Sequence, residues 1–142
     1  MSESGYSGTP LMKKLGIKPG MRGLFIGRRH CLEVAEVLQR AFEFVDLDRE
    51  TAREGRYDYI HVFETDRSSL IHHIRILKPE LNLSGMLWVS WPKRASGWAM
   101  TLDGNIVRQI GLDAGLVDIK VCAVDDVWSG LKFVIPVKDR KA

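Results

Sequence analysis

An apolar stretch near residue 90 constrains the fold of this chain more than any other feature. The residues from Gly85 to Gly97 read GMLWVSWPKRASG. Met86–Trp91 form an almost unbroken apolar run, and Pro92 ends it. A short apolar run rich in Trp and Val, bounded by Gly and Pro, predicts a β-strand that is buried on both faces. Such strands occur in sheets that helices cover on both sides, so the stretch favours an α/β fold. Lys93 and Arg94 follow the run directly, at the carboxyl end of a strand, where open α/β sheets bind ligands.

Strands and helices alternate along the rest of the chain. Short apolar runs predict strands at Gly23–Gly27, Phe44–Leu47, Tyr57–Phe63, Met86–Trp91, Val117–Val124 and Leu131–Val137. Apolar spacings of three and four predict helices that begin near Thr9, near Cys31, at Thr65 or Asp66, and at Asp103 or Asn105, and Leu81–Ser84 is expected to be a loop. This order predicts a mostly parallel sheet between helices. The last two strands are joined by a turn-rich segment without a helix, which predicts an antiparallel β-hairpin at one sheet edge.

The length and composition predict one globular domain. The chain has 142 residues, of which 45% are hydrophobic and 27% charged, close to the average of globular proteins. We expect residues 1–20 to form an N-terminal extension whose short helix packs on the domain. Residues 21–142 are then expected to form the single α/β domain.

Charge and hydropathy argue against several classes of function. The formal net charge is +3, but the basic residues are scattered rather than gathered on one element, so nucleic-acid binding is not expected. No apolar run approaches the ~20 residues that span a bilayer, and the first residues lack the pattern of a signal peptide. The two cysteines, Cys31 and Cys122, are far apart and fit a reducing compartment. These features predict a cytoplasmic protein that does not associate with membranes.

Three stretches carry a resemblance to a bacterial family. They are GYSGTPLMKKLGIKPGM (Gly5–Met21), WVSWPKRASG (Trp88–Gly97) and GLVDIKVCAVDDVWSGLKFV (Gly115–Val134), and they resemble the family called domain of unknown function 3052. That family implies no established activity. The order of strands and helices with its closing hairpin also resembles the class I S-adenosylmethionine-dependent methyltransferase fold. This resemblance implies a three-layer, Rossmann-like architecture.

The sequence departs from the methyltransferase pattern after the first predicted strand. Enzymes of that class usually carry a Gly-rich turn there, about GxGxG, whose glycines let the backbone approach the cofactor. Here only Gly27 matches, since Arg28 and Arg29 follow it. The family also often holds the cofactor ribose with an acidic residue after the second strand, for which Asp46 and Asp48 are candidates. The sequence therefore predicts no cofactor, with S-adenosylmethionine as the alternative.

Cations from two strand ends are predicted to meet at one edge of the sheet. Arg28, Arg29 and His30 lie at a strand-to-helix junction, where free backbone N–H groups and guanidinium groups can bind an anion. The alternative is a solvated loop whose arginines pair with carboxylates. Lys93 and Arg94 lie beside an indole that can stack on a ligand, or else the indole belongs to the core and the lysine points to solvent. The predicted ligand-binding residues are Gly27, Arg28, Arg29, His30, Glu64, Trp91, Lys93 and Arg94.

Other reactive side chains offer weaker candidates. Cys122 shares a strand face with Lys120, whose charge can lower the thiol pKa, but a small buried cysteine is the alternative. His72 and His73 are adjacent in a predicted helix, and adjacent helical residues diverge by about 100°, so no metal site is expected. His61 lies inside an apolar strand, where we expect it to pair with a buried carboxylate or carbonyl.

Two functions remain open from the sequence. The first is a non-catalytic or regulatory binding domain that holds a small anionic ligand or a protein partner at the carboxyl ends of the strands. The alternative is an S-adenosylmethionine-dependent methyltransferase, or another small-molecule enzyme that binds its cofactor in an atypical way. A homodimer is possible in either case, because the predicted strands Val117–Val124 or Leu131–Val137 can present an exposed edge.

Overall fold

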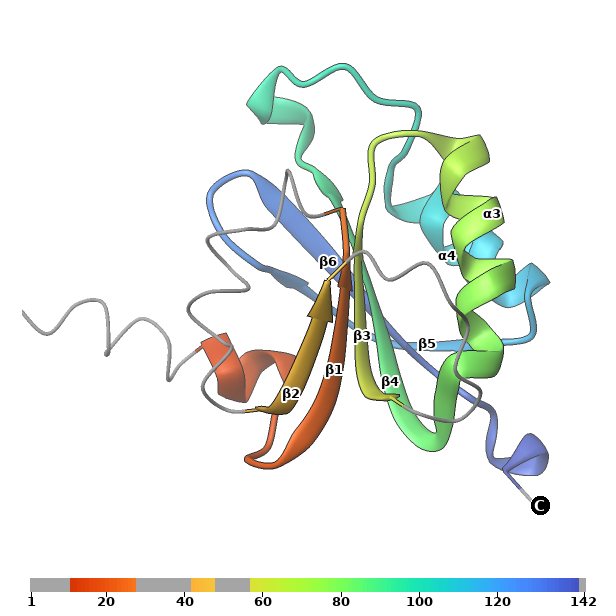
Figure 1. The fold of residues 1–142 in the computed structure, drawn as a ribbon. Coiled ribbons are helices and arrows are strands. Elements are labelled where there is room, and N and C mark those ends of the chain that lie inside the picture. The colour runs from red at the N-terminus through yellow and green to blue at the C-terminus, as the bar shows by residue number, and fades with distance from the viewer. Residues whose placement is uncertain (1–10, 28–41, 48–56, 141–142) are drawn as a thin grey trace, which may run out of the picture.

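The computed structural model describes residues 11–27, 42–47 and 57–140 (Figure 1). In these ranges six strands form one sheet with the order β2-β1-β3-β4-β6-β5. The strands are β1 (Met21–Ile26), β2 (Phe42–Leu47), β3 (Tyr57–Phe63), β4 (Leu81–Pro92), β5 (Val117–Ala123) and β6 (Trp128–Val134). The helices are α3 (Arg67–Leu77) and α4 (Gly104–Asp113), with a short helix at residues 11–15 and single 3-10 turns η2 (Lys78–Glu80), η3 (Arg94–Ser96) and η4 (Val137–Asp139).

The sheet is mixed, and the order in which the chain adds its parallel strands reverses at β1. Strands β2, β1, β3 and β4 are parallel, whereas β6 runs antiparallel to both β4 and β5. The chain passes from β1 to β2 on one side and then returns to place β3 on the other side of β1. This is a topological switch point, the position at which open α/β sheets bind ligands. The predicted Rossmann-like α/β fold with a terminal antiparallel hairpin is confirmed.

Side-chain caps fix where the helices begin, and they decide between the alternatives that the sequence left open. The Asp66 carboxylate accepts a hydrogen bond from the Ser69 backbone N–H at 2.9 Å and begins α3. Asp103 does the same for α4 through Ile106, also at 2.9 Å. Each cap satisfies a backbone donor that the first helical turn leaves free.

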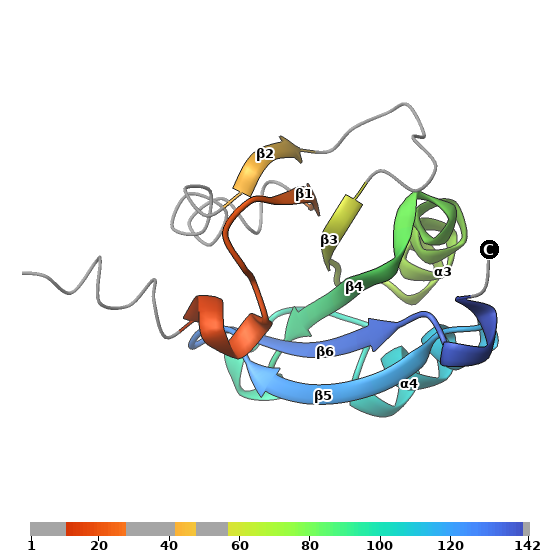
Figure 2. The ribbon, with the colours of Figure 1, turned by 90° about the horizontal axis from the view of Figure 1, so that it is seen from below.

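The two faces of the sheet bury different kinds of side chain. Figure 2 shows α3 and α4 on one face and the helix of residues 11–15 on the other. The α3/α4 face is mainly aliphatic, with Leu24, Ile60, Val62, Leu87, Val89 and Leu131 among its buried strand residues. The opposite face is mainly aromatic, with Phe25, Tyr59, Phe63, Trp88 and Trp128 packed around Leu15 and Ile17. Alternating strand residues therefore build two chemically distinct cores.

The stretch that predicted the fold forms the central part of β4. Residues 85–92 are all buried, as expected of a strand covered on both faces. The expectation of a loop over Leu81–Ser84 is wrong, because β4 already begins at Leu81. Leu81 pairs with Tyr57 across a register irregularity and is almost fully buried. This pairing is long-range, so the polar residues that follow Leu81 hide it in the sequence.

The hairpin strands differ in position from their predicted ranges. β6 covers Trp128–Val134 rather than Leu131–Val137, because Trp128 pairs with Pro92 at the end of β4. β5 ends at Ala123 and forms the sheet edge, with Ile119 57% and Val121 67% exposed. The homodimer through this edge stays a prediction.

Two further expectations concern other parts of the chain. The predicted helix near Cys31 and the acidic candidate Asp48 lie outside the described residues. Within the described ranges, no helix has the length and apolar character needed to cross a bilayer. The division at residue 20 between extension and domain stays a prediction.

Candidate functional site

The carboxyl ends of β1 and β3 approach each other closely at the switch point. Gly27 follows β1 with a φ of 92°, a conformation that residues with a side chain rarely adopt. A Cβ atom at Gly27 would collide with the backbone carbonyl oxygen of Phe63, the last residue of β3. Only glycine fits here, for both reasons. Gly27 therefore lies at the switch point, where the absence of a side chain lets the ends of β1 and β3 pack closely.

Glu64 comes directly after β3 and provides a fixed carboxylate beside the switch point. Its Oε1 accepts hydrogen bonds from the backbone N–H groups of Thr65 at 2.9 Å and Asp66 at 3.1 Å. Its Oε2 lies 3.3 Å from Nδ1 of His73, without the angle of a hydrogen bond. Partial burial alone raises the pKa of Glu64, but His73 and the two N–H donors outweigh it and hold the pKa below its ordinary value. Glu64 is therefore ionised at neutral pH.

A cavity lies at the carboxyl end of β4, and we call it the strand-end pocket. Its volume is about 580 Å³. It is lined by Trp91, Lys93, Arg94, Trp98, Met100, Thr101, Leu102, Asp103, Ile106 and Ser129. The structure thus brings three of the predicted residues, Trp91, Lys93 and Arg94, to one cavity.

The aromatic and basic side chains of the strand-end pocket differ in their burial and in their contacts. Trp91 is buried in the aliphatic core and also lines the pocket, and its contact with a ligand stays a prediction. Lys93 is tied to the β5–β6 turn, since its Nζ donates to the Asp125 carbonyl at 2.8 Å. Arg94 is exposed and begins η3. Trp98 is half exposed and packs edge to face on Trp128, with ring centroids 5.3 Å apart. The pocket therefore combines indole surface with two cations and one carboxylate, Asp103.

Backbone hydrogen bonds join the switch point to the strand-end pocket. The Glu64 N–H donates to the Ser90 carbonyl at 3.0 Å, and the Thr101 N–H donates to the Thr65 carbonyl at 2.9 Å. The Thr101 hydroxyl in turn accepts from the Arg67 N–H at 2.7 Å. The segment before α4 is thereby held against the loop after β3. Gly27 and Glu64 form one part of a continuous edge, and the strand-end pocket forms the next part.

Some predicted site residues fall outside this description, and some lining residues escaped prediction. Arg28, Arg29 and His30 lie outside the described residues, so their role stays a prediction. The lining residues of the segment before α4 were missed, most notably Trp98 and Thr101. Trp98 offered a signal, because a large aromatic residue inside a Gly- and Ser-containing loop often contacts a ligand or covers a cavity.

A row of three buried polar side chains lies on the aromatic face of the sheet, where the His61 ring stacks on Phe25 and Phe63. His61 Nδ1 lies 2.8 Å from the Tyr59 hydroxyl, and His61 Nε2 lies 2.6 Å from the Ser90 hydroxyl. The expectation of a carboxylate or carbonyl partner for His61 is therefore wrong; its partners are two hydroxyl groups, each of which can donate or accept. Burial lowers the pKa of His61 to about 3, so the imidazole is neutral. All three residues are fully buried, so none of them is exposed to a ligand.

The remaining chemical candidates are weaker in the structure than in the sequence. Burial raises the pKa of the Cys122 thiol despite the nearby charges of Lys14 and Lys120, which favours the alternative of a small buried cysteine. Asp46 accepts a hydrogen bond from the Tyr57 hydroxyl, so its carboxylate already has a partner. Among the described residues, no three His, Cys, Asp or Glu side chains gather closely enough to hold a metal ion.

Comparison with known proteins identifies the fold. No family model matches the chain, and no curated protein matches its sequence. Solved structures do match. An S-adenosylmethionine-dependent methyltransferase from Aquifex aeolicus superposes with a TM-score of 0.60 at 15% identity, over 91% of this chain and 89% of that chain.

Two further similar structures contain the cofactor or its product. The Burkholderia thailandensis 1,6-didemethyltoxoflavin-N1-methyltransferase, with bound S-adenosylhomocysteine, has a TM-score of 0.64 at 11% identity, over 92% of this chain and 76% of that chain. The Synechocystis magnesium protoporphyrin IX methyltransferase, with bound S-adenosylmethionine, has a TM-score of 0.60 at 12% identity, over 95% and 79%. Identities this low show the fold alone. This chain has the fold of S-adenosylmethionine-dependent methyltransferases.

Proposed function

We propose that this protein is an S-adenosylmethionine-dependent methyltransferase that acts on a small anionic acceptor. The observation that carries the proposal is the division of charge along one edge of this fold. An ionised carboxylate, Glu64, lies at the end of β3, and two cations, Lys93 and Arg94, lie at the end of β4. Each strand end thus offers the charge opposite to that of its proposed ligand, a cationic cofactor beside Glu64 and an anionic acceptor beside Lys93 and Arg94.

The described residues at the switch point support the cofactor through their charge. Glu64 adds negative charge beside that point, and S-adenosylmethionine carries positive charge on its sulfonium and ammonium groups. When bound, the cofactor supplies an electrophilic methyl group. The part of the protein is to hold that group against the acceptor in the right orientation.

The strand-end pocket fits a planar acceptor that carries an acidic group. Trp91 and Trp98 offer aromatic surface on which a planar ring can stack. Arg94 can bind a carboxylate through two parallel hydrogen bonds, and Lys93 adds a second positive charge. The cavity volume of about 580 Å³ lies in the range of small-molecule sites. The acceptor class that we propose is therefore a small aromatic or heteroaromatic acid.

One sequence feature favours a second candidate, a non-catalytic domain that binds a small anion in the same pocket. Arg28 and Arg29 follow Gly27 where a methyltransferase usually has further glycines. Cations there favour an anionic ligand over a positively charged cofactor. In this candidate, ligand binding at the strand-end pocket occurs without methyl transfer.

A methyl-transfer assay separates the two candidates. The protein is incubated with S-adenosylmethionine that carries a radiolabelled methyl group and with a panel of small aromatic acids. We expect transfer to at least one acid, and about a tenfold higher KM for that acid in Arg94→Gln. The exposed Lys138 lies on η4, outside the lining of the pocket, so Lys138→Gln is a charge-matched control that keeps the wild-type KM. Binding of an acid without any transfer supports the non-catalytic candidate.

A further inference from the structure

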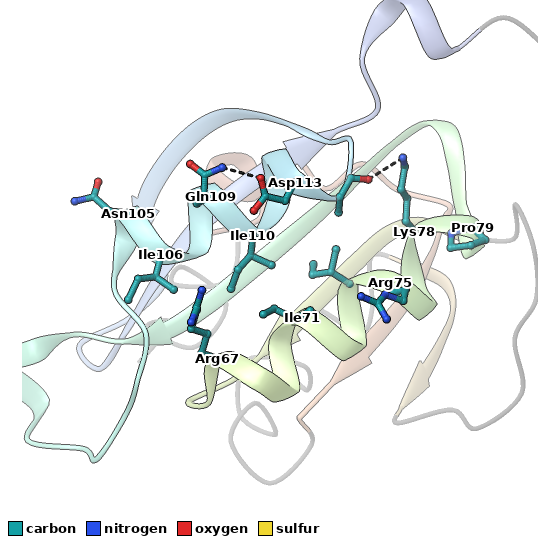
Figure 3. Close-up of a pocket in the computed structure, with 12 residues that line it drawn as sticks. Arg67, Ile71, Arg75, Lys78, Pro79, Asn105, Ile106, Gln109, Ile110 and Asp113 are labelled. Carbon is teal, nitrogen blue, oxygen red and sulfur yellow. Dashed lines mark hydrogen bonds between the residues drawn. The ribbon is translucent and has the colours of Figure 1, made fainter.

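A second cavity lies between α3 and α4, and we call it the interhelical groove. Figure 3 shows the two helices as its facing walls. Its volume is about 580 Å³. Its apolar surface comes mainly from four isoleucines, two on each helix: Ile71, Ile74, Ile106 and Ile110. Ile74 and Ile110 are almost fully buried, so the floor of the groove is continuous with the aliphatic core.

The α3 wall of the groove adds two arginines to this apolar surface. Arg67 and Arg75 both line the groove and are exposed at its rim (Figure 3). They are eight residues apart, so about 12 Å separates them along the helix axis. In the described part of the chain, neither guanidinium makes an ion pair or a hydrogen bond with another residue. Both are available to an anion from solution.

The other charged residues of the groove already have partners. Lys78 Nζ donates to the Ala114 carbonyl at 2.9 Å and joins the end of α3 to the end of α4. The Asp113 carboxylate accepts from the Gln109 side chain at 2.8 Å along α4. Figure 3 shows the Lys78 bond at the end of the groove remote from Arg67 and the Gln109–Asp113 bond along α4. Arg67 and Arg75 on α3 are therefore the cations of the groove that keep free donors, while the Asp113 carboxylate adds one negative charge on α4.

We propose that the interhelical groove binds an amphiphile that has an apolar chain and one anionic head group, such as a fatty carboxylate. The isoleucines take up the apolar chain, and a guanidinium at the rim binds the carboxylate through charge-assisted hydrogen bonds. A cavity of this volume suits a small molecule, whereas a protein partner needs a more extended surface. The site is separate from the strand-end pocket, although Ile106 lines both, and it does not depend on methyl transfer.

Dodecanoate is a suitable probe, used below its micelle concentration and followed by titration calorimetry on the full chain. We expect saturable binding with one ligand per chain. Dodecanol, which has the same chain without the charge, should bind at least about tenfold more weakly. Acetate, which has the charge without the chain, should not bind measurably.

Variants assign the binding to the groove. The double variant Arg67→Gln, Arg75→Gln should weaken dodecanoate by about tenfold and leave dodecanol unchanged. Ile71 is only partly buried, so Ile71→Trp can fill the groove without rebuilding the core, and it should abolish the binding of both ligands. The matched control is Arg108→Gln. Arg108 lies on α4 outside the groove and pairs with Asp118 at 3.0 Å, and its loss should change neither affinity.

Several outcomes overturn the proposal. Equal affinity for dodecanoate and dodecanol removes the role of the arginines. Binding that does not saturate, or that survives Ile71→Trp, is adsorption elsewhere on the surface. If light scattering shows a dimer that Ile71→Trp converts to a monomer, a second copy of the chain covers the groove in place of an amphiphile.

Discussion

The strand-end pocket and the interhelical groove have the same volume and share Ile106, but they are built in different ways. The pocket takes its walls mainly from a strand end and from the irregular segment before α4, and its lining mixes aromatic, apolar, hydroxylated and basic side chains with one carboxylate, Asp103. The groove takes its walls almost entirely from two helices, with isoleucines inside and arginines at the rim. Both rest on the aliphatic core, to which Trp91 and Leu102 of the pocket and Ile74 and Ile110 of the groove belong.

This difference indicates that the two cavities suit different tasks. Loops at the carboxyl edge of a parallel sheet expose backbone and polar side chains that regular elements bury, and this suits them to recognise and orient a reacting molecule. Two packed helices instead expose side chains in rows and offer an apolar trough with few fixed polar groups. We therefore expect chemistry at the first cavity and binding without chemistry at the second.

The largest effect is expected from Gly27→Ala at the switch point. The added Cβ collides with the Phe63 carbonyl, and the positive φ of 92° is strained for alanine. The free energy of unfolding should therefore fall by about 3 kcal/mol. Urea denaturation measures the change. Gly97→Ala is the control, because Gly97 has a similar φ of 77° with no atom within 4 Å of the added Cβ. It should cost only about 1 kcal/mol; equal costs would show that the close approach of β1 and β3 has no energetic consequence.

The next effect concerns His61, the histidine that is buried on the aromatic face of the sheet. The folded pKa of His61 is about 3 and its ordinary value is 6.5, so in this window the unfolded chain binds a proton that the folded chain does not. Stability is therefore fully present above pH 6.5 and falls as the pH drops, by about 2 kcal/mol between pH 6.5 and pH 5. The pKa values of Glu64 and Asp58 are also lowered, but the stability that these groups contribute is lost only when the pH falls toward their ordinary pKa values of 4.5 and 3.8.

Two histidine variants isolate this effect. His61→Gln keeps side-chain hydrogen-bonding groups near Tyr59 and Ser90 but cannot titrate, so its stability should be nearly constant over that pH range. The matched control is His72→Gln on the exposed side of α3, which should keep the wild-type pH dependence. A wild-type protein as stable at pH 5 as at pH 6.5 is the contrary result.

A smaller effect separates the two cavities by ligand. Lys93→Gln should weaken an aromatic acid in the strand-end pocket by about tenfold, because it removes a cation from that wall. It should leave the affinity for dodecanoate unchanged, since Lys93 does not line the groove. Calorimetry with both ligands on one variant gives the comparison, and a parallel loss of both affinities would mean that the cavities are one site.

The smallest effect is expected at the shared wall. Ile106→Ala removes apolar contact surface from both cavities, so each ligand should bind a few-fold more weakly, by about 1 kcal/mol. Val137→Ala removes a similar side chain that is 73% exposed and touches neither cavity, and it should change nothing. If Ile106→Ala weakens one ligand alone, only one of the cavities uses this wall.

The sequence predicts those parts of the fold that depend on local patterns. Tyr57–Phe63 matches β3 at both ends, because a strand that pairs on both sides and is bounded by polar residues is apparent from its own residues. The start of β4 is not apparent, because Leu81 joins the sheet through Tyr57, a residue distant in the sequence. The shift of β6 has the same origin, since Pro92 selects Trp128 as its partner.

The candidate site divides in the same way. Lys93 and Arg94 are predictable, because residues that follow a parallel strand lie at the carboxyl edge of the sheet. Trp98 and Thr101 are not, because the backbone bond from Thr101 to Thr65 sets the path of their segment. The partners of His61 depend on which hydroxyl groups the strand register places beside the ring, and residue spacing does not encode this.

Titration calorimetry of the wild-type protein with S-adenosylmethionine tests the central claim most directly. The proposal predicts one binding site per chain with a dissociation constant below about 100 μM, equivalent to about 5 kcal/mol or more of binding free energy. Glu64→Gln should weaken this binding, because it removes the negative charge at the switch point. The absence of any binding heat at millimolar S-adenosylmethionine, from a protein that is folded by circular dichroism, would contradict the proposal.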